Sequence, residues 1–109
     1  MNPQRENDTR FKSRIFYALS DGIRLEILDF LQGGEKCVCE IVPKLNLIQP
    51  LISRHLRILK ETGIIRCRKD GTKRFYSIVD QKIFNVIGNI TPELANALKA
   101  EMLKQVVCT

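Results

Sequence analysis

An apolar helical pattern that runs directly into a charged hairpin pattern is the feature that most constrains the fold of this chain. Ile52, Leu56 and Leu59 recur at spacings of four and three residues, as on the buried face of a helix. A proline near the start of this pattern and a glycine after it suit the two ends of a helix. The sequence therefore predicts a helix from Gln49 to Thr62.

Two β-prone runs follow that helix. They span Ile64–Arg68 and Arg74–Ile78, and the dipeptide Asp70-Gly71 lies between them. An Asp-Gly pair between two such runs is a strong signal for a β-hairpin. The sequence therefore predicts a two-stranded hairpin directly after the helix.

Most of the remaining apolar residues also recur at helical spacing. Asp21 suits the cap of a helix that the pair Gly33-Gly34 ends, and Thr91-Pro92-Glu93 suits the start of the last helix. The further helical segments that we expect are Ile15–Leu19, Ile23–Leu31, a short segment from about Cys39 to Leu45, and the region from Gln81 onward.

The order of these segments predicts a mainly α fold with a two-stranded β-wing, which is a winged helix-turn-helix. A chain of 109 residues suits one domain, spanning residues 1–109. Leu94, Leu98, Met102 and Val106 share one face of the last helix, which either packs on the chain's own core or forms a dimer seam with the first helix. We expect a homodimer, because so small a domain leaves much apolar surface to cover.

Positive charge is concentrated around the predicted helix and hairpin. The formal net charge is +6, and eight lysines and arginines lie between Arg54 and Arg74 against only two acidic residues. This concentration favours a polyanion such as double-stranded DNA, with the helix in the major groove and the hairpin on the flanking backbone. The alternative is a solvated basic face on a protein-interaction module.

The helix side opposite the apolar face carries candidate DNA contacts. Glutamine and arginine can hydrogen-bond base edges, serine can reach bases or phosphates, leucine can touch a thymine methyl, and lysine suits phosphate. His55 suits either packing or a phosphate contact. On the hairpin, a basic cluster suits phosphate or the minor groove. The candidates are Gln49, Leu51, Ser53, Arg54, His55, Arg57 and Lys60 on the helix, and Lys69, Lys73 and Arg74 on the hairpin.

The four cysteines are expected to be reduced. The amino terminus has no apolar run of signal-peptide type, and no stretch approaches membrane-spanning length, so we expect a cytoplasmic protein without a membrane partner. In that compartment an even cysteine count does not by itself indicate disulfides. Metal binding or redox sensing is the more useful question for these thiols.

Cys37 and Cys39 are candidate ligands for a soft metal or metalloid ion. Two thiols one residue apart point about 200° apart on a regular helix, so they can hold one ion only where the backbone is not yet helical. They precede the short predicted helix, whose amino-terminal dipole, together with Lys36, favours thiolates. Thiolates select ions such as As(III), Sb(III), Cd(II), Pb(II) and Zn(II).

Three stretches resemble the arsenic-repressor (ArsR/SmtB) family of metalloregulators. They are Ala18–Leu28, with the sequence ALSDGIRLEIL, the cysteine box Cys37-Val38-Cys39-Glu40, and the run from Gln49 to Ile65 followed by Arg68-Lys69-Asp70-Gly71 and Tyr76. The resemblance covers about Ile15 to Asp80. It implies a winged-helix homodimer whose first and last helices form the dimer seam. It also implies that the dimer represses an operator and releases it when its metal binds.

The chain departs from the family's known metal sites. Val42 stands where one type of arsenic sensor has a third cysteine, and Lys82 stands where the zinc sensors need a histidine. The first 36 residues contain none of the cysteines that the cadmium and lead sensors use. Cys108 is a further candidate ligand, or else an exogenous thiol completes the site, whereas Cys67 suits a small packed residue.

Two alternative hypotheses retain the repressor function without metal sensing, and a third assigns a different function. The thiol pair, with or without Cys108, could be a redox switch, or the repressor could have lost effector sensing. A cysteine-dependent enzyme is the third class. It is disfavoured because the single histidine, His55, lies in the predicted DNA-facing helix and a Cys/His pair needs an orienting partner.

Overall fold

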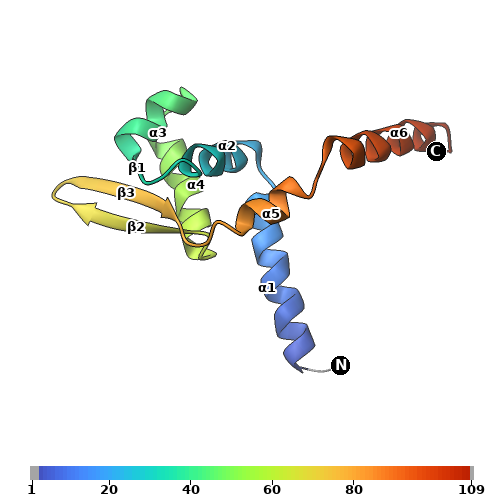
Figure 1. Cartoon of the computed structure of the whole chain (residues 1–109), viewed down its shortest axis with the longest axis horizontal. Helices are drawn as coiled ribbons and strands as arrows, with labels where there is room; N and C mark the ends of the chain where they lie inside the picture. The colour runs from blue at the N-terminus through green and yellow to red at the C-terminus, as the bar shows by residue number, and fades with distance from the viewer. Residues whose placement is uncertain (1–2, 109) are drawn as a thin grey trace.

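The computed structural model describes residues 3–108, which form six helices and a small sheet (Figure 1). None of the helices in this part of the chain is long and apolar enough to cross a membrane. In chain order the elements are α1 (Pro3–Leu19), α2 (Gly22–Leu31), β1 (Lys36–Cys37), α3 (Val38–Leu45), α4 (Gln49–Glu61), β2 (Ile65–Asp70), β3 (Lys73–Ile78), α5 (Ile83–Gly88) and α6 (Pro92–Cys108).

The structure confirms most of the helix boundaries that were predicted from capping and helix-breaking residues. Asp21 caps α2, and its Oδ1 accepts hydrogen bonds from the Ile23 and Arg24 amides at 2.8 and 3.2 Å. The Thr91 hydroxyl accepts from the Leu94 amide at the start of α6. Gly63 follows α4 with a φ of +79°, a conformation that glycine adopts without steric cost. α1 extends well before Ile15, into a polar stretch that has no apolar pattern.

The predicted hairpin is present, but the sheet has a third strand. β2 and β3 pair antiparallel, and the two-residue turn at Gly71-Thr72 places Gly71 at φ +63°, as a type II′ turn requires at its first position. β1 adds to the other edge of β3, opposite Phe75 and Tyr76, so the strand order is β1-β3-β2. The predicted two-stranded wing is confirmed, and β1 is an additional edge strand that the sequence did not reveal, because a two-residue strand carries no alternating pattern.

The core lies between α2, α3, α4 and the base of the sheet. The predicted inward residues Ile52, Leu56 and Leu59 of α4 are fully buried, which confirms the apolar face of that helix. Their fully buried neighbours are Ile27, Leu28, Leu31, Ile41 and Ile65. With one face buried in this way, the opposite face of α4 is left to the solvent.

The two terminal helices project from this body in different directions (Figure 1). On α6, the predicted apolar face is exposed, from 44% at Leu94 to 71% at Val106. On α1, Phe11, Phe16 and Tyr17 are each about three-fifths exposed, at 59 to 61%. The α6 face therefore does not pack on the core of its own chain.

One buried cation connects three helices. Arg24 of α2 is 5% exposed; its Nε donates to the Ala18 carbonyl at 2.7 Å and its Nη2 to the Tyr17 carbonyl at 3.1 Å. Its Nη1 lies 3.1 Å from Nδ1 of His55 on α4. The guanidinium thus donates hydrogen bonds to carbonyls at the end of α1 and contacts His55 on the buried side of α4. A buried charge needs hydrogen-bond partners of this kind.

Replacing Arg24 by alanine should destabilise the fold. We expect Arg24→Ala to lower the free energy of unfolding by roughly 3 kcal/mol, because two main-chain carbonyls and the imidazole lose a buried donor. Urea unfolding followed by circular dichroism measures this change. Arg14→Ala, at an exposed position of α1, is the matched control and should unfold near the wild-type midpoint. Equal midpoints for the two variants would contradict the role given to Arg24.

Candidate functional site

A hollow of about 830 Å³ lies between α3, α4 and the wing. The start of α3 forms one wall, the exposed face of α4 forms the floor, and the turn and start of β3 form the other wall. The residues that carry its chemistry are Cys37, Cys39, Gln49, Ser53, Arg54, Arg57, Lys60, Thr72, Lys73, Arg74 and Tyr76. The two groups of residues singled out from the sequence, the basic side chains and the thiol pair, therefore line one space.

Five of the seven candidates on α4 lie together on its exposed face. Gln49, Ser53, Arg54, Arg57 and Lys60 are all exposed and line the hollow. These positions repeat at spacings of three and four residues, so their side chains follow one side of the helix. A row of this kind, with donors and cations on one helix face, matches the dimensions and chemistry of a DNA major groove.

The other two candidates on α4 lie differently. Leu51 is half-buried. His55 is 7% exposed, and its Nδ1 lies 3.1 Å from Arg24 Nη1 and 3.9 Å from Asp21 Oδ1. The expectation that His55 faces DNA is corrected by this position, and packing, the other role expected of it, is what the structure shows. The helical spacing could have revealed the burial, since position 55 lies three residues after Ile52 and four before Leu59, but it could not reveal the partner Arg24 on another helix.

The wing candidates are exposed near its turn. Lys73 and Arg74 line the hollow, and Lys69 is the cross-strand partner of Arg74. Thr72 and Tyr76, which sequence reasoning did not single out, line the hollow as well. Burial, and then a hydrogen bond with the Cys67 side chain, raise the pKa of Tyr76, which keeps its phenol neutral at ordinary pH.

Cys37 and Cys39 converge, as expected of thiols placed ahead of a helix. Cys37 is the N-cap of α3, with extended backbone at φ −74° and ψ 150°, and the two cysteines form a disulfide with Cα atoms 5.0 Å apart. The expectation that these two cysteines are reduced is therefore wrong for this structure, because the extended backbone at Cys37 brings the two sulfurs together. The Cys39 amide donates to Cys37 Sγ at 3.1 Å, and Glu40 Oε2 accepts from the Cys37 amide at 2.8 Å. Cys37 is buried and Cys39 is exposed, so the pair is reached from the hollow through Cys39.

Lys36 does not add its charge to the thiols as expected. Its Nζ lies 5.2 Å from the centre of the Phe30 ring, among residues that line a different hollow. Neighbouring residues on a strand point to opposite faces, so Lys36 and Cys37 diverge. The amino terminus of α3 remains, and it would favour thiolates at this place once the disulfide is reduced.

Once the disulfide is reduced, Cys37 and Cys39 would supply two thiolate ligands for a soft ion, and a third ligand has to come from elsewhere. Among the described side chains, those of residues 3–106, no group of three histidine, cysteine or acidic residues is placed to hold a metal. Val42 lines the hollow at the position where a third cysteine was sought. Cys67 on β2 is half-buried against the core, which agrees with a packed residue. Cys108 ends α6, and its side chain lies outside the described residues.

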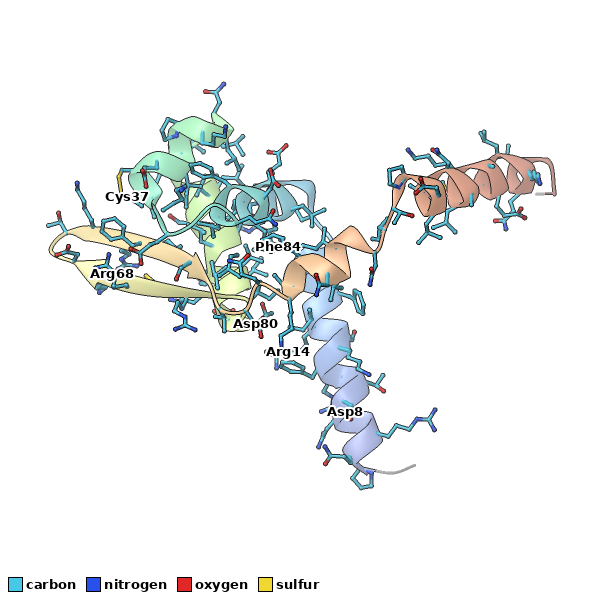
Figure 2. The ribbon with its side chains drawn as sticks, in the orientation of Figure 1. Asp8, Arg14, Cys37, Arg68, Asp80 and Phe84 are labelled. Carbon is cyan, nitrogen blue, oxygen red and sulfur yellow. A yellow bond between two sulfur atoms is a disulfide. The ribbon has the colours of Figure 1, made fainter. Side chains whose placement is uncertain are left out.

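An ion pair fastens the segment before β1 to the wing. Arg68 of β2 donates from Nη2 to Glu35 Oε1 at 2.7 Å and from Nε to Oε2 at 3.2 Å, and its guanidinium lies 4.7 Å from the centre of the Phe75 ring. Figure 2 shows Arg68 in the wing, with Cys37 above it at the start of α3. The bidentate contact spans β3 and links the strand that carries Cys37 to the outer wing strand.

Comparisons with known proteins agree on one family. Residues 21–66 match the family described as "Bacterial regulatory protein, arsR family". An uncharacterised HTH-type transcriptional regulator of Methanocaldococcus jannaschii is 47% identical over 76 residues, which is 69% of this chain and 85% of that protein. An arsenical resistance operon repressor of Staphylococcus aureus is 37% identical over 78 residues, or 72% of this chain and 75% of that protein.

A solved structure shares the architecture over nearly the whole chain. It is the homodimeric winged helix-turn-helix DNA-binding domain of a possible ArsR-family transcriptional regulator from Mycobacterium bovis. The TM-score is 0.73 at 26% identity, covering 96% of this chain and 93% of that chain. The match confirms the predicted winged helix-turn-helix fold.

Acidification should break the ion pair between Glu35 and Arg68. The hydrogen bond from Arg68 lowers the pKa of Glu35 below its ordinary value of 4.5, so the contact is fully present above that pH. It is lost as the pH falls through the lowered pKa and the carboxylate gains a proton. The Arg68 Nε–H resonance in NMR spectra should therefore shift in this acidic range. Glu35→Gln should show no such transition, and identical titrations of both proteins would contradict the pairing.

Proposed function

The chain belongs to the arsR family of bacterial regulatory proteins, and from this premise we propose that it is a homodimeric repressor that releases its operator when a thiophilic ion binds Cys37 and Cys39. The family consists of DNA-binding transcriptional regulators, not enzymes. The observation that carries the proposal is that the thiol pair and the basic face of α4 line the same hollow. Such a repressor would act in the cytoplasm, where thiols are kept available for metals.

For DNA binding, we assign α4 to the major groove and the wing to the flanking backbone. Gln49, Arg54 and Arg57 are exposed and can hydrogen-bond base edges, and Ser53 can add a base or phosphate contact. Lys60 on α4 and the basic wing residues Lys69, Lys73 and Arg74 suit phosphates, which position the protein without reading sequence. Leu51 is less available for a thymine methyl, because it is half-buried.

For assembly, we assign the exposed apolar faces of α1 and α6 to a homodimer seam. Leu98, Met102 and Leu103 are 55 to 74% exposed on α6, and continuous apolar surface of this kind is normally covered. The similar Mycobacterium bovis domain is homodimeric. A two-fold dimer would present its two α4 helices to half-sites about 34–36 Å apart on an imperfect palindrome.

For the effector, we assign As(III) or Sb(III) first, with Cd(II), Pb(II) and Zn(II) as further candidates. The two sulfurs lie together in a disulfide and Cys39 is open to the hollow, so after reduction the pair would be a donor set that fits the soft ions that thiolates select. The Staphylococcus aureus relative is named an arsenical resistance operon repressor. Reduced Cys37 and Cys39 would hold the ion, and its binding would supply the signal that changes DNA affinity. Cys108, from either protomer, or an exogenous thiol would complete its coordination.

The arrangement of the chain gives a route from the thiols to DNA release. Cys37 belongs both to β1, which pairs with β3, and to the cap of α3. A change at its sulfur therefore acts on the two walls of the hollow that flank α4. Because Arg74 lies on β3 one residue from the partner of Cys37, the wing contacts with phosphate are the first that such a change reaches.

Loss of Arg57 should weaken sequence-specific binding. On a duplex selected from a random library by the wild type, we expect Arg57→Ala to lose about 1–3 kcal/mol if the guanidinium reads a base. On an unrelated duplex the loss should be smaller. Fluorescence anisotropy between 50 and 200 mM salt measures both affinities, in the range where phosphate contacts weaken steeply. Arg10→Ala removes the same charge from α1 and should leave the difference between the two duplexes unchanged. Equal losses on both duplexes would mark a phosphate contact instead.

Thiophilic ions should release DNA only when the thiol pair is intact. With reductant present, we expect arsenite or antimonite to dissociate the selected duplex from the wild type but not from Cys37→Ser or Cys39→Ser, because one sulfur cannot replace the chelating pair. Cys67→Ser is the matched control and should release like the wild type. Anisotropy titrations with arsenite, antimonite, cadmium, lead and zinc test this. Metal sensing is wrong if none of the ions releases DNA and the two serine variants behave as the wild type.

The disulfide between Cys37 and Cys39 favours a thiol redox switch as a second candidate. If the pair is a redox switch, mild oxidant should reversibly release DNA from the wild type and no ion should do so. Release by oxidant should be lost in Cys37→Ser and in Cys39→Ser. A chain that responds to neither oxidant nor ion, yet binds its duplex, is a repressor that has lost effector sensing. A chain with no salt-dependent affinity for duplex DNA is a protein-interaction module instead.

A further inference from the structure

Ile48 is an exposed apolar residue at a position that favours polar ones. It is the N-cap of α4, with φ −71° and ψ 148°, and it makes no side-chain hydrogen bond to the first helical amides. Serine, threonine, aspartate and asparagine are preferred at this position because their oxygens accept such bonds, and isoleucine is among the least favourable residues. At the starts of α2 and α6, by contrast, Asp21 and Thr91 do provide caps.

The exposure of Ile48 separates it from the other apolar surface of the molecule. It is 70% exposed, and among the large apolar residues described only Leu103 and Val106 of α6 are more so. Most of the other exposed apolar residues belong to α1, α5, α6 and the segment between α5 and α6, where the proposed dimer seam accounts for many of them. Ile48 lies instead at the start of the helix that carries the basic face.

The position of Ile48 indicates what could cover it. It directly precedes Gln49, which lines the hollow, so it continues the proposed DNA surface at the amino end of α4. In helix-turn-helix proteins the amino-terminal residues of the recognition helix contact base edges. The apolar group exposed on the floor of the major groove is the 5-methyl of thymine.

We propose that Ile48 is a specificity-determining residue that packs on the 5-methyl group of a thymine in each operator half-site. The proposal rests on DNA binding through α4, and it gives the methyl contact expected of Leu51 to a more exposed neighbour. A capping residue at this position would stabilise the helix but leave the thymine methyl without an apolar partner. Stability and specificity should therefore change in opposite directions when Ile48 is replaced by serine.

The test compares thymine with uracil, which differ only by the 5-methyl group. Wild-type protein and the Ile48→Ser, Ile48→Val and Val79→Ser variants each bind the selected duplex with its thymines replaced one at a time by uracil. At one position in each half-site we expect the wild type to lose affinity about fourfold, the ratio for burying one methyl-sized group of about 0.8 kcal/mol. Ile48→Ser should be insensitive there while its melting temperature rises.

The control variants keep the result interpretable. Ile48→Val retains apolar contact without a cap and should keep most of the uracil effect, whereas Val79→Ser removes an exposed apolar side chain after β3 and should keep all of it. If Ile48→Ser folds and responds to uracil as the wild type does, the proposal is overturned. A wild type that shows no methyl-dependent position overturns it too, and DNA binding as such then still stands. A wild type that selects no duplex removes the proposed function as well.

Discussion

The rest of the molecule depends on the burial of one guanidinium. Arg24 is removed from water, and it is stabilised there because two carbonyls at the end of α1 and the His55 imidazole surround it. Burying a cation without such partners would cost several kcal/mol, so the three helices are held in the one arrangement that supplies them. His55 lies on the buried side of α4. The exposed side of α4 is therefore presented at a fixed angle, which a surface that reads DNA requires.

The buried side of α4 is held by the contact between His55 and Arg24, and the hollow over its exposed side is completed by the wing and by α3. Both are joined through Cys37, which pairs with Phe75 on β3 and caps α3. The contact between Glu35 and Arg68 then links the same segment to β2. This ion pair is exposed, and its contribution to overall stability is small. Its bidentate geometry, however, limits how the wing can move independently of the thiol strand.

Local sequence patterns predicted what depends on local interactions. The buried face of α4, the Asp21 cap and the turn at Gly71 each follow from residues a few positions apart, and the structure confirms them. The residues that the patterns misplaced depend on distant partners. Position 55 lies on the apolar face of α4, but the polar partner that His55 has there, Arg24, is 31 residues away and no local pattern indicates it. Lys36 lies over Phe30 because β1 pairs with β3, and a strand of two residues leaves no period to recognise.

The position of the thiol pair explains why two candidate signals share one site. On a regular helix, side chains two residues apart diverge, but extended backbone at Cys37 turns its sulfur back toward the first turn of α3, where Cys39 lies. An ion that both reduced sulfurs bind and an oxidant that takes two electrons from them as they join in a disulfide would both act on this same geometry. Because the pair forms a wall of the hollow that α4 and the wing complete, the signal does not have to cross the domain. Under the proposed function, a rearrangement at the cap of α3 would therefore alter one wall of the hollow whose floor is the exposed face of α4.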